Sequence, residues 1–143
     1  MIYINSDGGS RGNPGPGAVG VIIRKDEEIL IKYGAFIGQQ VTNNIAEYEA
    51  LIRGLELASK VTDKDVTCFL DSELIVKQLL GEYKVRNHAL IELFLKVQKS
   101  QEKFKTVIYK HTIRWDKFQQ MADKILNEEL DKRGFRRYYK RNN

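Results

Sequence analysis

The sequence predicts a single α/β domain built on a five-stranded mixed sheet flanked by helices, and three observations support this prediction. The chain has 143 residues, of which 42% are hydrophobic and 30% are charged, as expected for one domain with its own core. Residues 1–43 contain three strand-like apolar runs and no helical pattern. Beyond them, strand-like runs alternate with helical segments. This order indicates three antiparallel strands, followed by two strands that right-handed crossovers bring parallel to the first.

The three antiparallel strands are expected at residues 2–7, 18–24 and 28–36. Residues 8–17 contain five glycines and both prolines of the chain, so we expect a loop between the first two strands. A charged turn at residues 25–27 joins the second strand to the third.

The second part of the chain supplies the helices and the two parallel strands. Ser72 is a natural helix N-cap, and Gly81 is a helix stop. The expected elements are a helix at 44–60, a strand at 66–70, a short helix after Ser72, a helix at 88–101, a strand at 106–111 and a helix at 116–132.

Charge is distributed unevenly along the chain. The net charge is +5, but residues 132–143 hold six basic and no acidic groups, so residues 1–131 carry −1. We therefore expect a catalytic or binding domain at 1–131 and a basic tail at 132–143. The tail is either a phosphate-binding appendage or a frayed terminus. Its basic residues are Lys132, Arg133, Arg136, Arg137, Lys140 and Arg141.

Several classes of protein are excluded by composition. No apolar run approaches the roughly 20 residues of a membrane helix. The first residues lack the order of a signal peptide. One cysteine, Cys68, permits no internal disulfide and fits a reducing compartment. We therefore expect a cytoplasmic protein with no membrane contact.

Two aspartates end strands of the predicted parallel part. Asp7 follows the first strand and Asp71 follows the strand at 66–70, so neighbouring strands would place them side by side. Each also has a simpler interpretation, because Asp7 and Gly8 suit a turn and Asp71 precedes a helix cap.

Glu47 lies in the middle of the apolar face of the helix at 44–60, where an unpaired carboxylate is costly. The spacing of Asn44 and Glu47 also fits a capping box. If Glu47 instead joins the two aspartates, three acids converge with no lysine or arginine near them. Hard divalent cations such as Mg²⁺ are the usual solution to that repulsion.

The last helix offers Asp123 as a fourth acid, at the edge of its apolar stripe. Asp116, Glu129 and Asp131 are competing candidates that periodicity does not separate.

Other kinds of site find no support. The glycine stretch contains no phosphate-binding loop motif and precedes a strand, so it lacks the helix N-terminus that a nucleotide site needs. His88 and His111, with one distant cysteine, are too few for a structural zinc site.

Four motifs in order resemble type 1 ribonuclease H over residues 2–131: DGGSRGNPGPGAVGVII, TNNIAEYEALIRGLELA, FLDSELIVKQLLGEYKVRN and ADKILNEELD. The chain looks closest to the compact archaeal and Gram-positive-like branch, which lacks a basic protrusion. The resemblance implies a ribonuclease H-like fold. It also implies an endonuclease that cuts the RNA strand of RNA/DNA hybrids with two Mg²⁺ ions, with Mn²⁺ as a substitute.

The same resemblance implies roles for individual residues. Asp7, Glu47, Asp71 and Asp123 match the four catalytic, metal-binding carboxylates, and Asp7 would bridge both ions. Ser10, Gly12 and Asn13 match contacts to the RNA strand. Thr42 and Asn44 match a pocket for a DNA phosphate, and Asn43 matches a contact to a base in the minor groove.

The sequence departs from the family pattern at three places. His111 lies twelve residues before Asp123 without the flexible loop of the enterobacterial enzyme, so we expect it to end the fifth strand and assign it no catalytic role. Gln119 and Glu73 stand where relatives carry other polar groups.

Two alternatives to the hybrid-specific nuclease remain open. One is cleavage of double-stranded RNA, alone or alongside hybrids. The other is a nucleic-acid-binding module that does not cleave, although such a module has no need of four carboxylates. We expect a monomer in either case.

Overall fold

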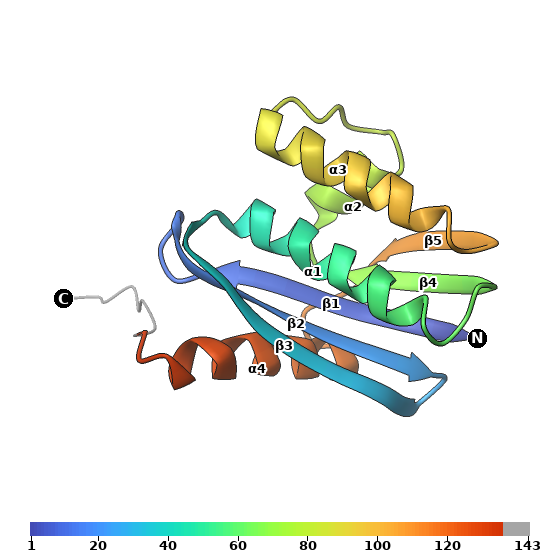
Figure 1. The fold of residues 1–143 in the computed structure, drawn as a ribbon, viewed down its shortest axis with the longest axis horizontal. Helices are drawn as coiled ribbons and strands as arrows, with labels where there is room; N and C mark the ends of the chain where they lie inside the picture. The colour runs from blue at the N-terminus through green and yellow to red at the C-terminus, as the bar shows by residue number, and fades with distance from the viewer. Residues whose placement is uncertain (136–143) are drawn as a thin grey trace.

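The computed structural model describes residues 1–135 and contains the predicted five-stranded sheet in the order β3-β2-β1-β4-β5 (Figure 1). β1 pairs antiparallel with β2, which pairs antiparallel with β3, while β4 and β5 run parallel to β1. The elements are β1 (Ile2–Ser10), β2 (Gly15–Lys25), β3 (Glu28–Val41), α1 (Asn43–Ala58), β4 (Asp65–Leu70), α2 (Glu73–Leu79), α3 (His88–Gln101), β5 (Thr106–His111) and α4 (Lys117–Lys132). The expected fold class is confirmed, with three antiparallel strands followed by two strands parallel to the first.

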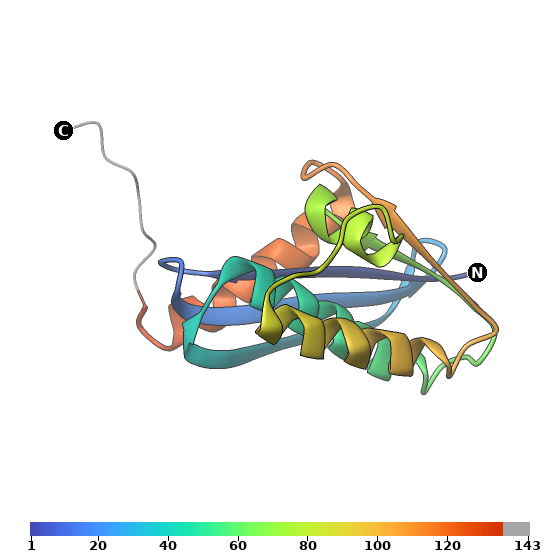
Figure 2. The ribbon, with the colours of Figure 1, turned by 90° about the horizontal axis from the view of Figure 1, so that it is seen from above.

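Helices cover both faces of the sheet (Figure 2). α1 and α3 pack together on one face, and α4 packs on the other face against β2 and β1. The larger core lies under α1, where Ala50, Leu51 and Leu55 are fully buried as the helical periodicity predicts. On the solvent side of the same helix, Glu49 pairs with Arg53 at 2.8 Å.

The expected loop at residues 8–17 is wrong in its extent. β1 continues to Ser10 and β2 begins at Gly15, which leaves a turn at residues 11–14 with a cis bond between Asn13 and Pro14. Gly8 and Gly9 pair with Val19 and Ala18 across the ladder. Glycine disfavours strands on its own, but its backbone groups pair as well as any others once a neighbouring strand is present. β3 likewise extends past residue 36 to Val41, because its backbone pairs with β2 as far as Gly15.

The C-terminal end of α4 is closed by a Schellman motif. Gly134 adopts φ +81°, the N–H of Phe135 donates to the carbonyl of Leu130 at 3.2 Å, and the N–H of Gly134 donates to the carbonyl of Asp131 at 3.0 Å. The Phe135 ring then stacks on Phe36 of β3 with ring centroids 5.6 Å apart. Phe135 is therefore docked on the domain.

The tail predicted at residues 132–143 is described only in its first four residues. Lys132 is the last residue of α4 and pairs with Glu129 at 2.6 Å. The guanidinium of Arg133 lies 4.5 Å from the centre of the Phe36 ring. Arg136, Arg137, Lys140 and Arg141 lie outside the described residues. Among residues 1–135, no helix combines the length and the apolar character that crossing a bilayer requires.

Candidate metal and nucleic-acid site

Asp7 and Asp71 lie side by side at the carboxyl ends of two neighbouring parallel strands. The β1–β4 ladder pairs Asn5 with Phe69, Asp7 follows two residues later on β1, and Asp71 comes directly after β4. Asp7 is buried, with 6% of its surface exposed. This is the placement that the strand pattern predicts.

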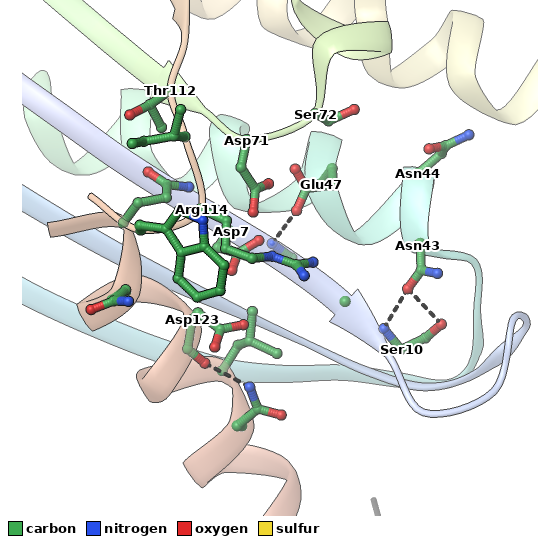
Figure 3. Close-up of a pocket in the computed structure, with 18 of the residues that line it drawn as sticks. Asp7, Ser10, Asn43, Asn44, Glu47, Asp71, Ser72, Thr112, Arg114 and Asp123 are labelled. Carbon is green, nitrogen blue, oxygen red and sulfur yellow. Dashed lines mark hydrogen bonds between the residues drawn. The ribbon is translucent and has the colours of Figure 1, made fainter. Parts of the chain in front are cut away.

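Glu47 reaches the same point from α1 on the overlying face. The N–H of Gly8 donates to Glu47 Oε1 at 2.6 Å, and within residues 1–135 no donor contacts the buried Oε2 (Figure 3). A side chain on Gly8 would collide with the carbonyl of Ala46, so only glycine lets α1 lie this close to β1. The capping-box interpretation of Glu47 is wrong, because Thr42 is the N-cap and accepts from the Ile45 N–H at 3.1 Å.

The carboxylates of Asp7, Glu47 and Asp71 each offer an oxygen within 4.8 Å of the others. Burial raises the pKa of Asp7 well above its usual value, and the charge of Glu47 raises it further. Burial also raises the pKa of Glu47 to about 8, with the charge of Asp71 adding to the effect. Three acids held this close need protons or cations between them. All-oxygen donors suit hard divalent ions such as Mg²⁺.

Asp123 faces the same cavity from α4 (Figure 3). It is exposed, and its negative charge contributes to the raised pKa of both Asp7 and Asp71. α4 comes this close to the sheet because Gly20 lies beneath it, where a side chain would collide with the carbonyl of Ala122. We call Asp7, Glu47, Asp71 and Asp123 the acidic cluster.

The three competing acids of α4 have other partners. Asp116 is the N-cap of the helix and accepts from the N–H groups of Phe118 and Gln119 at 3.0 Å. Asp131 pairs with Arg11 at 2.8 Å, and Glu129 pairs with Lys132. The tertiary structure thus separates Asp123 from acids that the periodicity could not distinguish.

Arg114 contradicts the expectation that no basic group lies near the acids. It belongs to the connection between β5 and α4 and lines the cavity of the acidic cluster, where its charge acts on Asp71 (Figure 3). Burial raises the pKa of Asp71, and the positive charge of Arg114 opposes that effect. The sequence offered only an arginine shortly before the last helix, with no spacing rule to connect it to the carboxylates.

Residues at the β1–β2 turn and at the start of α1 form the second part of the site. The side chain of Asn43 accepts from the Ser10 N–H at 2.9 Å and from its hydroxyl at 3.2 Å, and the N–H of Asn43 donates to Asn13 Oδ1 at 3.0 Å. The Ser10 hydroxyl also lies 2.5 Å from the carbonyl of Gly12. Thr42 and Asn44 line a smaller cavity beside this turn, together with Asn13 and Asn87. All six predicted contact residues therefore lie along one edge of the molecule.

Arg11 anchors the same turn from the opposite side and was not expected to have a role. Its guanidinium donates to the carbonyl of Phe135 at 2.5 Å and to the carbonyl and side-chain oxygens of Asn127 at 3.2 and 3.0 Å. It also pairs with Asp131, and its side chain is only 6% exposed. Asn127 in turn donates to the carbonyl of Asp123 at 2.9 Å. Arg11 thus joins the turn to the end of the helix that carries Asp123.

The residues that depart from the family pattern have clear local contacts. Gln119 is buried, donates to the Ser6 carbonyl at 2.7 Å and accepts from Asn5 at 3.2 Å, so it supports the end of β1. His111 ends β5 as predicted, and its Nε2 lies 3.2 Å from the carbonyl of Asp71. Glu73 pairs with Lys77 at 3.0 Å on the surface of α2.

Several known proteins are similar to this chain in sequence and in fold. A family model described as reverse transcriptase-like matches residues 5–128. A bifunctional protein of Mycobacterium tuberculosis is 34% identical over 132 residues, covering 91% of this chain but 35% of that protein, so the chain spans about a third of this relative. The structure of RNase H1 from the halophilic archaeon Halobacterium salinarum matches with a TM-score of 0.85 and 34% identity, covering 92% of this chain and 98% of that one. LC11-RNase H1, isolated from compost and solved in complex with an RNA/DNA hybrid, matches with a TM-score of 0.84 and 40% identity, covering 93% and 99% of the two chains.

Proposed function

This chain belongs to the ribonuclease H family, and we propose that it hydrolyses the RNA strand of RNA/DNA hybrids with two divalent metal ions held by the acidic cluster. The observation that carries the proposal is the convergence of Asp7, Glu47 and Asp71 within 4.8 Å at the carboxyl ends of parallel strands. The structure of a relative in complex with an RNA/DNA hybrid supports the choice of substrate.

The acidic cluster fits divalent ions in charge and in donor type. Its donors are carboxylate oxygens, burial and then the neighbouring negative charges raise the pKa of Asp7 and of Glu47, and no donor among residues 1–135 contacts Glu47 Oε2. Mg²⁺ is the ion we expect, with Mn²⁺ as a substitute. When bound, the two ions would lower the pKa of the attacking water and neutralise charge on the leaving 3′ oxygen, which leaves 5′-phosphate and 3′-hydroxyl ends.

The chain's own groups position the reactants. The N–H of Gly8 holds the carboxylate of Glu47 in one orientation, and Gln119 holds the end of β1 through the Ser6 carbonyl. Arg114 brings a positive charge to the side of the cavity near Asp71, where it would interact with a non-bridging phosphate oxygen. Holding these groups in place before the substrate arrives is the main contribution of the protein to such a reaction.

The β1–β2 turn and the start of α1 would hold the duplex. Ser10, Gly12 and Asn13 would contact 2′-hydroxyls of the RNA strand, and Asn43 a base in the minor groove. Thr42 and Asn44 would hold a DNA phosphate near the N-terminus of α1, where backbone N–H groups favour anions. A hybrid with one ribonucleotide should be cleaved more slowly than one with a run of four. Equal rates would refute these contacts.

The basic tail would add affinity for the duplex that does not depend on its base sequence. Arg133, Arg136, Arg137, Lys140 and Arg141 follow the helix that carries Asp123, so they would reach backbone phosphates of the same duplex. We expect the chain to act as a monomer in the cytoplasm, which size-exclusion chromatography and cell fractionation test.

One gel tests the central proposal. Labelled RNA/DNA hybrid, double-stranded RNA and double-stranded DNA are incubated with the protein, with and without Mg²⁺. We expect cleavage of the hybrid only with the metal and with 5′-phosphate ends. Asp71→Asn should abolish it, and Asp63→Asn, which changes an exposed acid outside the acidic cluster, should not.

The other outcomes of this gel identify the alternatives. Cleavage of double-stranded RNA would make that duplex the substrate, or a second one. Binding of the hybrid without cleavage under any metal would indicate a nucleic-acid-binding module. A 2′,3′-cyclic phosphate end would mean that the ribose hydroxyl is the nucleophile and would refute the proposed mechanism.

A further inference from the structure

The connection between β5 and α4 exposes two large apolar side chains at the rim of the acidic cluster. Ile113 is 64% exposed and Trp115 is 72% exposed, more than any other large hydrophobic residue among residues 1–135. Both line the same cavity as Asp7, Asp71 and Asp123. Within the described residues, Trp115 has no aromatic or cation–π partner. An indole this exposed at the mouth of a functional cavity points to a binding surface.

Hydrogen bonds on both sides hold this connection in place. The N–H of Thr112 donates to the Leu70 carbonyl at 2.8 Å, which ties the connection to the end of β4. The N–H of Asp116 donates to the Ile113 carbonyl at 3.1 Å, so Arg114 and Trp115 occupy the two central positions of a hydrogen-bonded turn. Asp116 then caps α4. Trp115 therefore belongs to a hydrogen-bonded turn and not to a frayed segment.

The two central residues of the turn offer complementary chemistry. Arg114 directs its charge to the carboxylate of Asp71, where a phosphate would lie in the proposed function, while Trp115 offers an apolar aromatic surface one residue away. A nucleic-acid strand presents the matching pair, since a charged phosphate and an apolar sugar or base face alternate along it. Aromatic side chains in such positions pack against sugars and bases.

We propose that Trp115, with Ile113 beside it, packs against the nucleotide next to the cleaved bond on the RNA strand. The inference rests on the proposed function and adds to it a residue that determines how the strand is held on the α4 side of the acidic cluster. The cavity is continuous from the acidic cluster to Trp115, so a strand with its phosphate at the carboxylates would pass over the indole.

Trp115 is the only tryptophan of the chain, so intrinsic fluorescence reports on this residue alone. Asp71→Asn protein in Mg²⁺ is titrated with an unlabelled RNA/DNA hybrid, and binding is followed independently by the anisotropy of a labelled hybrid. We expect the tryptophan emission to change saturably with the same Kd, and quenching by acrylamide to fall about twofold as the indole is covered.

Variants in the wild-type background distinguish a direct contact with the RNA strand from an effect on folding. Trp115→Ala should raise the KM for the hybrid about tenfold, while kcat at saturation changes about twofold at most. Trp115→Phe should recover most of the loss, because it keeps an aromatic face. Leu95→Ala is the matched control, since Leu95 is also exposed but lies on α3 and lines a different cavity. Its KM should stay at the wild-type value.

The outcomes distinguish this inference from the function on which it rests. If the anisotropy shows that the hybrid binds while the tryptophan emission and its quenching stay unchanged, the proposed contact is refuted and the nuclease proposal stands. An equal rise of KM in Trp115→Ala and Leu95→Ala would overturn it as well. Failure of the wild-type protein to bind or cleave the hybrid would overturn both.

Discussion

Replacing Glu47 by glutamine removes one buried negative charge and keeps the oxygen that accepts the Gly8 N–H. Burial is the main cause that raises the pKa of Glu47 from 4.5 to about 8. The folded state therefore holds this proton more tightly than the unfolded state. The contribution of Glu47 to stability is fully present below pH 4.5 and is lost as the pH rises through about 8.

The size of the effect follows from the two pKa values. At about 1.4 kcal/mol for each pH unit between them, metal-free wild-type protein should lose about 4 kcal/mol of unfolding free energy between pH 5 and pH 8.5 through Glu47 alone. Glu47→Gln abolishes that loss and also removes one of the charges that add to the effect of burial in raising the pKa of Asp7. The variant should therefore be the more stable protein at pH 8.5 without metal, although we expect it to be inactive.

Urea unfolding in the presence of EDTA at pH 5 and pH 8.5 measures the difference. Adding Mg²⁺ at pH 8.5 should stabilise the wild type, because ligands that bind only the folded state do so, and should have much less effect on the variant. Glu49→Gln, which changes a partly exposed acid two residues away, is the matched control and should follow the wild type. A variant with the same pH dependence as the wild type, or one less stable at pH 8.5, would refute the reasoning.

Three further predictions follow from the contacts around the site. Gly20→Ala should push α4 away from the sheet, because the added methyl meets the carbonyl of Ala122, and should lower both the melting temperature and kcat; unchanged activity would contradict the close approach. Arg11→Ala should reduce the unfolding free energy by about 2 kcal/mol, since it leaves the carbonyl of Phe135 and the carboxylate of Asp131 without this donor, and should raise the KM for the hybrid; a melting temperature and KM equal to wild type would count against the anchor. Truncation after Phe135 should leave the melting temperature unchanged. It should reduce the slope of log K against log salt by roughly 2, if about half of the four removed charges reach phosphates. An unaltered slope in salt titrations would show that the tail does not bind the duplex.

Local pattern was enough to predict much of this protein. Strand-like runs that end at Asp7 and Asp71 predicted two parallel strands with an aspartate at the carboxyl end of each, and the structure places both aspartates at one edge of the sheet. Glu47 was predicted to point inward because helical periodicity depends only on residues three and four apart. The position of each carboxylate at a strand end or on an apolar helix face is encoded over a short stretch of chain, so the sequence alone is enough to predict it.

Contacts between distant segments were decided only by the tertiary structure. Asp123 and its competitors share one helix and similar spacing, and what separates them is the partner that each meets, such as Arg11 for Asp131. The same holds for Arg114, whose approach to Asp71 depends on the path of the connection before α4. The extent of β1 through Gly8 and Gly9 depends on the partner strand and on the helix above it, against the local preference of glycine. Such choices are made by packing between residues far apart in the sequence, because their free energies depend on neighbours that no local pattern specifies.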